Sequence, residues 1–168
     1  DSKAKQIVVP MISARIETIN NRNPKELIDE NNKSFWFING ERRISWSKNP
    51  PFNNPVIKGK WWDKDEINRL QISLDYKVAD DLKLKIGDSM TFNIFGNSVT
   101  GIITNFRKVD YRDLNINFAI LFNPKYASKI PHEFMSTVKF ENEELVNLSN
   151  ILRKLPTITY IKLSEYIN

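Results

Sequence analysis

Residues 87–110, GDSMTFNIFGNSVTGIITNFRKVD, restrict the fold of this chain more than any other stretch. Apolar residues alternate with polar ones on both sides of Gly96 and Asn97, and this pair tolerates the positive φ angles of a tight hairpin turn. The pattern predicts two antiparallel strands whose apolar faces need a common core. A further strand predicted over 116–122, INFAILF, completes a small antiparallel group.

The first forty residues predict a strand, a short helix and a second strand. Branched residues alternate over 6–19, which indicates a strand that bends at Pro10. Asn23 followed by Pro24 is typical of a helix start, because the Asn side chain can cap free amides and Pro fits the first turn. The aromatic run 34–38, SFWFI, favours a second strand.

A turn at Asn39 and Gly40 is expected to lead into another strand over 41–47, ERRISWS. The stretch 69–74, RLQISL, predicts a short alternating strand. Asp75 can cap the helix that follows, which we expect to end near Gly87.

The final third of the sequence changes to a strand, helix, strand pattern. Residues 134–140, FMSTVKF, and 157–163, TITYIKL, predict strands. Between them we expect a helix that Asn142 caps and Pro156 ends, with an apolar face formed by Leu145, Leu148, Leu152 and Leu155.

Two βαβ halves separated by a mostly β insertion can close into one four-stranded sheet with both helices on one face. This is the split βαβ arrangement. We therefore expect an α+β fold of two lobes. Segments 1–40 and 124–168 form the split βαβ lobe, and 41–123 form an inserted β-rich lobe.

Composition and charge limit the kinds of function that the chain can have. Of its 168 residues, 40% are apolar and 27% are charged, which is the balance of a folded globular protein. The net charge of +5 favours acidic surroundings, but the cations alternate with acids, as on an ordinary solvated surface. The chain has no cysteine and His132 is its one histidine, so we expect no metal site. It starts at Asp1 without Met, and we interpret it as an excised or processed segment.

Sequence signals of nucleotide binding and serine catalysis are missing. The five glycines form neither a P-loop nor a dinucleotide fingerprint, and no G-x-S-x-G elbow occurs. The longest apolar runs reach about five residues, far below the roughly eighteen of a membrane-spanning helix. Neighbouring acids could work as an acid–base pair or hold a cation, so a carboxylate hydrolase is one rival hypothesis. These acids are Asp63 with Asp65 and Glu66, Asp80 with Asp81, and Asp110 with Asp113.

Residues 57–66, IKGKWWDKDE, place two adjacent tryptophans between lysines. In an extended segment Trp61 and Trp62 point to opposite faces, so we expect one in a core and the other against solvent or a partner. Aromatic rings beside lysines also suit single-stranded nucleic acid. A basic single-stranded nucleic-acid-binding module is therefore a rival hypothesis of another class.

Three motifs follow one another along the chain: Gly59, Trp61 and Trp62; then Ile86, Gly87 and Asp88; then Arg107, Lys108, Val109, Asp110 and Tyr111, with Asn117, Phe118 and Pro124 beyond. In this order the chain resembles the extracytoplasmic domain of FtsX/MacB-type ABC transporter permeases, closest to the YbbP-like branch. The resemblance covers about 40–125 and continues more weakly to the end. Tyr111 stands where the family pattern has Trp.

The resemblance implies a periplasmic, MacB-like core domain at the bacterial inner membrane, with a porter-like lobe at 1–40 and 124–168 and an inserted β-rich lobe at 41–123. Both ends would connect to membrane helices, so Asp1 and Asn168 should lie close together. A cytoplasmic ATP-binding subunit would hydrolyse ATP. The domain would be no enzyme and would transmit helix movement to cargo or partner proteins.

The branch also implies a lipid-related cargo or a periplasmic esterase as partner, and neither a cofactor nor nucleic acid. The residues expected to contact cargo or partner are Trp61, Trp62, Arg107, Lys108 and Asp110. Which tryptophan faces out stays open at this point. An alternative for Arg107 and Asp110 is an ion pair with each other across a turn between the lobes.

Overall fold

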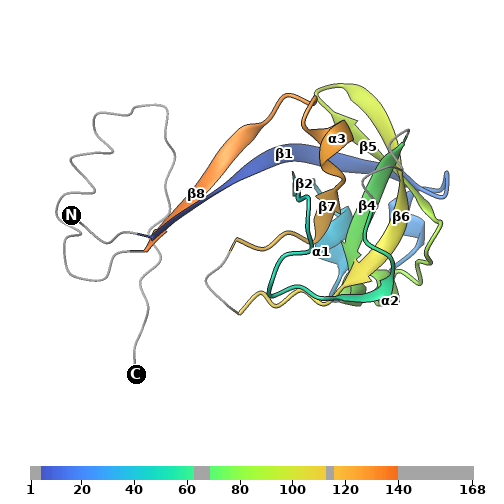
Figure 1. Cartoon of the computed structure of the whole chain (residues 1–168). Helices are drawn as coiled ribbons and strands as arrows, with labels where there is room; N and C mark the ends of the chain where they lie inside the picture. Colours follow the sequence, from blue (N-terminus) through green and yellow to red (C-terminus); the bar gives the residue numbers. More distant parts are fainter. Residues whose placement is uncertain (1–4, 63–68, 113–115, 140–168) are drawn as a thin grey trace. The chain divides into compact units, whose positions relative to one another are not determined.

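A computed structural model of the chain describes residues 5–62, 69–112 and 116–139 (Figure 1). These residues form one eight-stranded sheet with short helical segments beside it. The strands are β1 (Lys5–Ile19), β2 (Glu41–Trp46), β3 (Val56–Gly59), β4 (Leu70–Asp75), β5 (Ser89–Ile94), β6 (Asn97–Arg107), β7 (Ile120–Phe122) and β8 (Glu133–Lys139). The helical segments are η1 (Pro24–Glu26), α1 (Phe35–Ile38), α2 (Tyr76–Asp81) and α3 (Pro124–Ala127). No described helix is long and apolar enough to cross a membrane.

Six of the strands close into a barrel-like ring in the order β1, β2, β7, β4, β6, β5 and back to β1. The pairs β2–β7 and β4–β6 are parallel, and the other pairs of the ring are antiparallel. β1 closes the ring because it is 15 residues long: its middle pairs with β2 and its second half with β5. The pairing of β1 with β5 has a register shift between Ile16 and Thr18, where a β-bulge can bend the strand. Closure leaves these six strands without an open edge.

Apolar side chains fill the ring. In β5 every second residue is buried, namely Met90, Phe92 and Ile94. The Phe92 ring meets that of Phe122 edge-on, with 5.2 Å between centroids. Gly101 allows this density, because a Cβ there would lie 2.9 Å from a side-chain carbon of Ile72.

The predicted hairpin is confirmed, with its turn one residue earlier than expected. β5 and β6 are antiparallel, and Ile94 lies opposite Asn97. The two turn residues are therefore Phe95 and Gly96, with φ angles of 51° and 82°. The Asn93 side chain accepts a hydrogen bond from the Gly96 N–H at 3.0 Å, which favours the earlier turn.

Two of the three predicted caps, Asn23 and Asp75, are confirmed, and the third, Asn142, lies outside the described residues. The Asn23 side chain accepts from the Lys25 N–H at the start of η1, and the Asp75 side chain accepts from the Lys77 N–H at the start of α2, each at 3.1 Å. The strand predicted over 6–19 is β1, in which Ile12, Ala14 and Ile16 are buried and Thr18 is half-buried.

Several local predictions are wrong. α2 ends at Asp81 and not near Gly87, and the strand predicted over 116–122 is only Ile120–Phe122, which pairs with β2 and β4 and not with the hairpin. Residues 34–38 are not a strand, because Phe35–Ile38 form the single helical turn α1. The Asn32 side chain accepts from the Ser34 N–H at 2.8 Å, and such local bonds compete with strand pairing. β4 does not alternate, because all six of its residues are buried between β6 and β7.

The expected α+β class is not confirmed, because the described residues are mostly β. The helix predicted to begin at Asn142 and the strand predicted over 157–163 lie outside the described residues, as do Asp1 and Asn168. The two-lobe division therefore stays a prediction. By compactness the chain divides into a larger unit, Val8–Ser136, and a smaller one made of Asp1–Ile7 and Thr137–Asn168.

The chain enters and leaves the larger unit on neighbouring strands. β8 lies next to β1 in the sheet, and Figure 1 shows the two side by side in blue and orange. β1 is also paired with β2 and β5 of the ring. A displacement of the β1–β8 pair would therefore reach the ring through backbone hydrogen bonds.

Candidate functional site

Trp61 and Trp62 follow β3 and lie against each other. Their ring centroids are 3.8 Å apart and their planes differ by 37°. Trp61 Nε1 donates to the carbonyl of Lys48 at 2.9 Å, and Trp62 Nε1 donates to the carbonyl of Ser47 at 3.0 Å. The tryptophan pair thus holds the start of the loop 47–55.

The predicted opposite orientation of the two indoles is wrong. Both are half-buried and turn toward the same loop. The reason is Gly59, whose φ of +80° ends the extended strand before the tryptophans. Alternation along a strand therefore does not apply to them.

The tryptophan pair packs on a small apolar cluster that is separate from the ring core. Its buried members are Met11, Phe118 and Leu121, with Val9, Trp61, Trp62, Ile116 and Met135 partly buried around them. Val9 and Met11 belong to β1, and Met135 belongs to β8. The cluster therefore connects the tryptophan pair to the two strands by which the chain enters and leaves the larger unit.

The far end of loop 47–55 is held by the segment after β6. The Lys108 N–H donates to the carbonyl of Pro55 at 3.0 Å. The buried Asn54 accepts from the Asp110 N–H at 3.4 Å and donates to Asn117 Oδ1 at 3.0 Å. Asn117 Nδ2 in turn donates to the Asp110 carbonyl at 2.8 Å. The loop is thus fixed at both ends.

Arg107 is fully buried. Its Nε donates to Ser73 Oγ at 2.7 Å, and its Nη2 donates to the carbonyls of Phe118 at 3.0 Å and Ala119 at 3.3 Å. Burial lowers the pKa of Arg107 to about 10, so the guanidinium stays protonated at neutral pH. Arg107 therefore joins β6 to β4 and to the start of β7 from inside the molecule.

Asp110 does not pair with Arg107. Its carboxylate lies 2.8 Å from Arg112 Nη2, and the hydrogen bonds from Arg112 hold the pKa of Asp110 below its ordinary value. A second polar contact lies nearby: Tyr111 Oη donates to Asp75 Oδ2 at 2.9 Å, and burial raises the pKa of both groups. The alternative of an Arg107–Asp110 ion pair is therefore wrong.

The five residues predicted to contact a partner all belong to the structure around loop 47–55. Trp61, Trp62, Lys108 and Asp110 hold the loop, and Arg107 fixes the Phe118 backbone under the tryptophan pair. Their contacts with a partner stay a prediction. Sequence reasoning expected a loop at its prolines but selected neither its anchor Asn54 nor its fully exposed Phe52. An isolated Phe between two prolines and two asparagines was the available signal.

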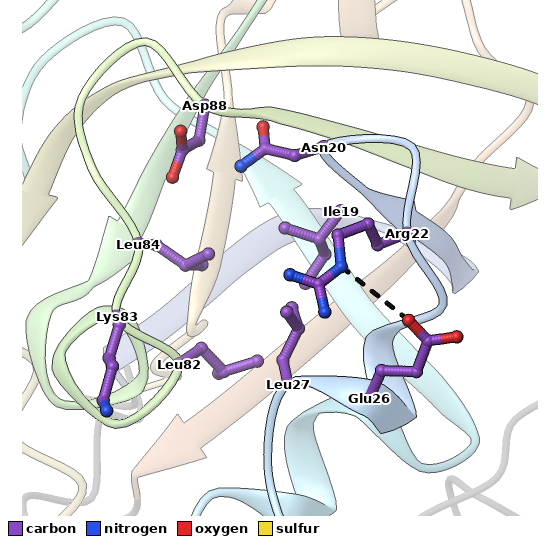
Figure 2. Close-up of a pocket in the computed structure, with 9 residues that line it drawn as sticks. All are labelled: Ile19, Asn20, Arg22, Glu26, Leu27, Leu82, Lys83, Leu84 and Asp88. Atoms are coloured by element: carbon purple, nitrogen blue, oxygen red, sulfur yellow. Dashed lines mark ion pairs between the residues drawn. The ribbon is translucent and has the colours of Figure 1, made fainter.

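A cavity of about 310 Å³ lies elsewhere in the larger unit, and Figure 2 shows the residues around it. Its lining consists of Ile19, Asn20, Arg22, Glu26, Leu27, Leu82, Lys83, Leu84 and Asp88. Four of its polar side chains already interact with neighbouring groups. Arg22 lies 3.7 Å from Glu26, and Asn20 and Asp88 accept hydrogen bonds from backbone N–H groups. We therefore assign no chemistry to this cavity.

Carboxylates do not converge in the part of the chain that the structure describes. There, no three Asp, Glu or His side chains lie close enough to share a metal ion. Asp81 accepts the Ser34 hydroxyl, and Asp110 is bound to Arg112. The acids at 63, 65, 66 and 113 lie outside the described residues. The described residues thus give the hydrolase hypothesis no support.

We expect Trp61→Phe and Trp62→Phe each to loosen loop 47–55 without unfolding the chain. Phenylalanine keeps a stacking ring but has no N–H, so a carbonyl of the loop loses its donor, at a net cost of about 1 kcal/mol. Hydrogen exchange measured by mass spectrometry should become faster over 47–55 and stay unchanged in β5. The control is Trp36→Phe, which changes an exposed indole outside this site. Unchanged hydrogen exchange over 47–55 in both variants would contradict the conclusion that the tryptophan pair holds the loop.

The chain is similar to a protein of known class. It is 26% identical over 158 residues to an Escherichia coli (strain K12) protein described as an uncharacterized ABC transporter permease, YbbP. The match covers 94% of this chain and 18% of the relative, so the chain spans less than a fifth of that protein. No family model matches the chain, and no solved structure matches it significantly. The similarity supports a transporter-associated domain.

Proposed function

We propose that this chain is the periplasmic domain of an ABC transporter permease of the FtsX/MacB type and that it transmits ATP-driven movement of membrane helices to cargo or partner proteins. The adjacency of β1 and β8 carries the proposal. A domain inserted between two membrane helices needs its incoming and outgoing segments side by side. The similarity to a permease over 94% of the chain supports the interpretation of this arrangement as a domain of a membrane transporter.

The contacts of the larger unit suit such a role. β1 is bonded to the ring through β2 and β5, and close-packed interiors deform little, so a pull on the β1–β8 pair moves the ring as one body. The tryptophan pair packs on the cluster of Met11, Phe118 and Leu121, on which Val9 and Met135 also pack, and it holds loop 47–55. The same pull therefore displaces that loop.

In this proposal the domain makes and breaks no bonds. A separate cytoplasmic ATP-binding subunit supplies the energy through the membrane part of the parent permease. Lipid-related cargo, or a periplasmic esterase as partner, is the first class to test. We carry the nucleic-acid hypothesis no further, because the two indoles stack on each other and their N–H groups are already bonded.

Cysteine labelling tests on which side of the membrane the chain lies. The chain has no cysteine, so Lys25→Cys or Phe95→Cys in a cysteine-free parent permease introduces a single exposed thiol. We expect a membrane-impermeant maleimide to label both in intact spheroplasts. Met90→Cys, fully buried in the ring, should react only after denaturation. Labelling of the exposed positions that requires lysis would contradict a periplasmic domain.

A further inference from the structure

Loop 47–55 presents the most exposed large apolar side chain of the described residues. Phe52 is 100% exposed, against 68% for Phe134 and 66% for Phe95. The loop is held at its start by the tryptophan pair and at its end by Asn54 and the Lys108 N–H. Pro50 and Pro51 further restrict its backbone. Phe52 is thus displayed on a fixed support.

Cations predominate among the described residues next to the loop. Residues 42–62 contain five cations and no Asp or Glu. Four of these cations are exposed: Arg43, Lys48, Lys58 and Lys60. Lys108, bound through its N–H to Pro55, is also exposed, and the neighbouring Asp110 is neutralised by Arg112. An anionic surface is the complement of this arrangement.

The loop also starts at the end of the larger unit where the chain enters and leaves. β2 runs antiparallel to β1, and Ser45 Oγ donates to the Pro10 carbonyl at 2.6 Å. The Trp46 ring meets the His132 ring edge-on just before β8, with 4.8 Å between centroids. If the proposed function holds, on which this step rests, this end of the unit faces the bilayer.

We propose that loop 47–55 is a membrane-contact loop for anionic phospholipid. Phe52 inserts at the boundary of headgroups and acyl chains, and Lys48, Lys60 and Lys108 bind lipid phosphates. An apolar ring flanked by lysines is the usual composition of an interfacial contact. A single protruding ring among polar neighbours fits a lipid surface better than a protein groove, which would meet a broader apolar patch.

Vesicle binding by the 168-residue chain tests the proposal. We expect cosedimentation with mixed phosphatidylglycerol and phosphatidylcholine vesicles and little with phosphatidylcholine alone. Phe52→Ala should weaken binding about tenfold, the effect of losing one inserted ring. The double change Lys48→Glu and Lys108→Glu should abolish binding, and added salt should weaken it. Phe95→Ala, at an exposed hairpin turn, is the matched control and should bind like the unsubstituted chain.

Circular dichroism checks that each variant is folded, and Phe52 makes no core contact whose loss could unfold it. Equal binding by Phe52→Ala and Phe95→Ala overturns the proposal, as does equal binding to neutral and anionic vesicles. The proposal is also overturned if a single-stranded oligonucleotide displaces the chain from vesicles and binds the unsubstituted chain and Phe52→Ala equally well. The cysteine labelling reports on the side of the membrane independently of Phe52, so the two proposals can fail separately.

Discussion

Arg107→Ala lowers the free energy of unfolding by about 3–5 kcal/mol, the range for removing a large buried side chain together with its hydrogen bonds. The side chain is fully buried and bridges Ser73 with the backbone of Phe118 and Ala119. Alanine leaves a cavity there and takes the donors away from Ser73 Oγ and the Phe118 carbonyl. Denaturant unfolding followed by tryptophan fluorescence measures the loss.

Arg112→Ala is the matched control for this result. Arg112 is another arginine of the same segment, but its side chain is 90% exposed and its ion pair with Asp110 lies at the surface. Exposed ion pairs contribute little to stability because solvent screens them, so this variant should unfold close to the unsubstituted chain. Similar losses of unfolding free energy in Arg107→Ala and Arg112→Ala would mean that Arg107 does not hold β6, β4 and β7 together.

Arg107→Lys should have an unfolding free energy between those of the two alanine variants, since an ammonium lacks the planar fork of donors.

Gly59→Ala should cost about 3 kcal/mol or more and should disrupt the tryptophan pair. A Cβ at this position would lie 2.3 Å from the Thr104 carbonyl oxygen, and the residue has a φ of +80° that alanine adopts at a cost of about 1–2 kcal/mol. Because the clash is with backbone, β3 has to move away from β6. The near-ultraviolet circular dichroism of the stacked indoles should weaken together with stability.

Gly96→Ala separates the two causes. Its φ is +82°, nearly the same as that of Gly59, but a Cβ added there would have no atom within 4 Å. This variant should show only the conformational cost and keep the indole signal. If both glycine variants lose the same stability, the close approach of β3 to β6 contributes nothing.

Local sequence signals predicted those parts of the fold that local contacts decide. The alternation on both sides of Gly96 indicated the hairpin, and Asn23 and Asp75 indicated the caps, because a turn or a cap depends on residues a few positions apart. The position of the turn was missed by one residue because Gly96 can occupy either turn position. The hydrogen bond from the Ser34 N–H to the Asn32 side chain, which competes with a strand at 34–38, is also a local contact. Its sequence signal is weaker than that of the hairpin or the caps.

Features set by distant contacts were not predictable from pattern. β1 pairs with β2 through its middle and with β5 through its second half, and only this double pairing closes the ring. Likewise, the conformation of Gly59 is fixed by its approach to Thr104 on β6. The orientation of both tryptophans depends on it, so alternation predicted the wrong result.

For the candidate site, the residues expected to contact a partner include Trp61, Trp62, Lys108 and Asp110. These four hold one loop in the structure, and their contacts with a partner stay a prediction. Arg107 was expected at a surface, and only the packing of β4, β6 and β7 shows that it is buried. Phe52 carries no periodic signal, so its exposure follows only from the loop anchors on both sides.

Paired spin labels in the parent permease, assembled with its ATP-binding subunit, test the central claim most directly. One pair, Glu41→Cys with Thr100→Cys, lies at exposed positions within the larger unit. A second pair joins Glu41→Cys to a membrane helix of the parent. We predict that ATP binding leaves the first distance unchanged and shifts the second, because the unit moves as one body through β1 and β8. A change in the first distance, or none in the second, would contradict transmission by a rigid domain.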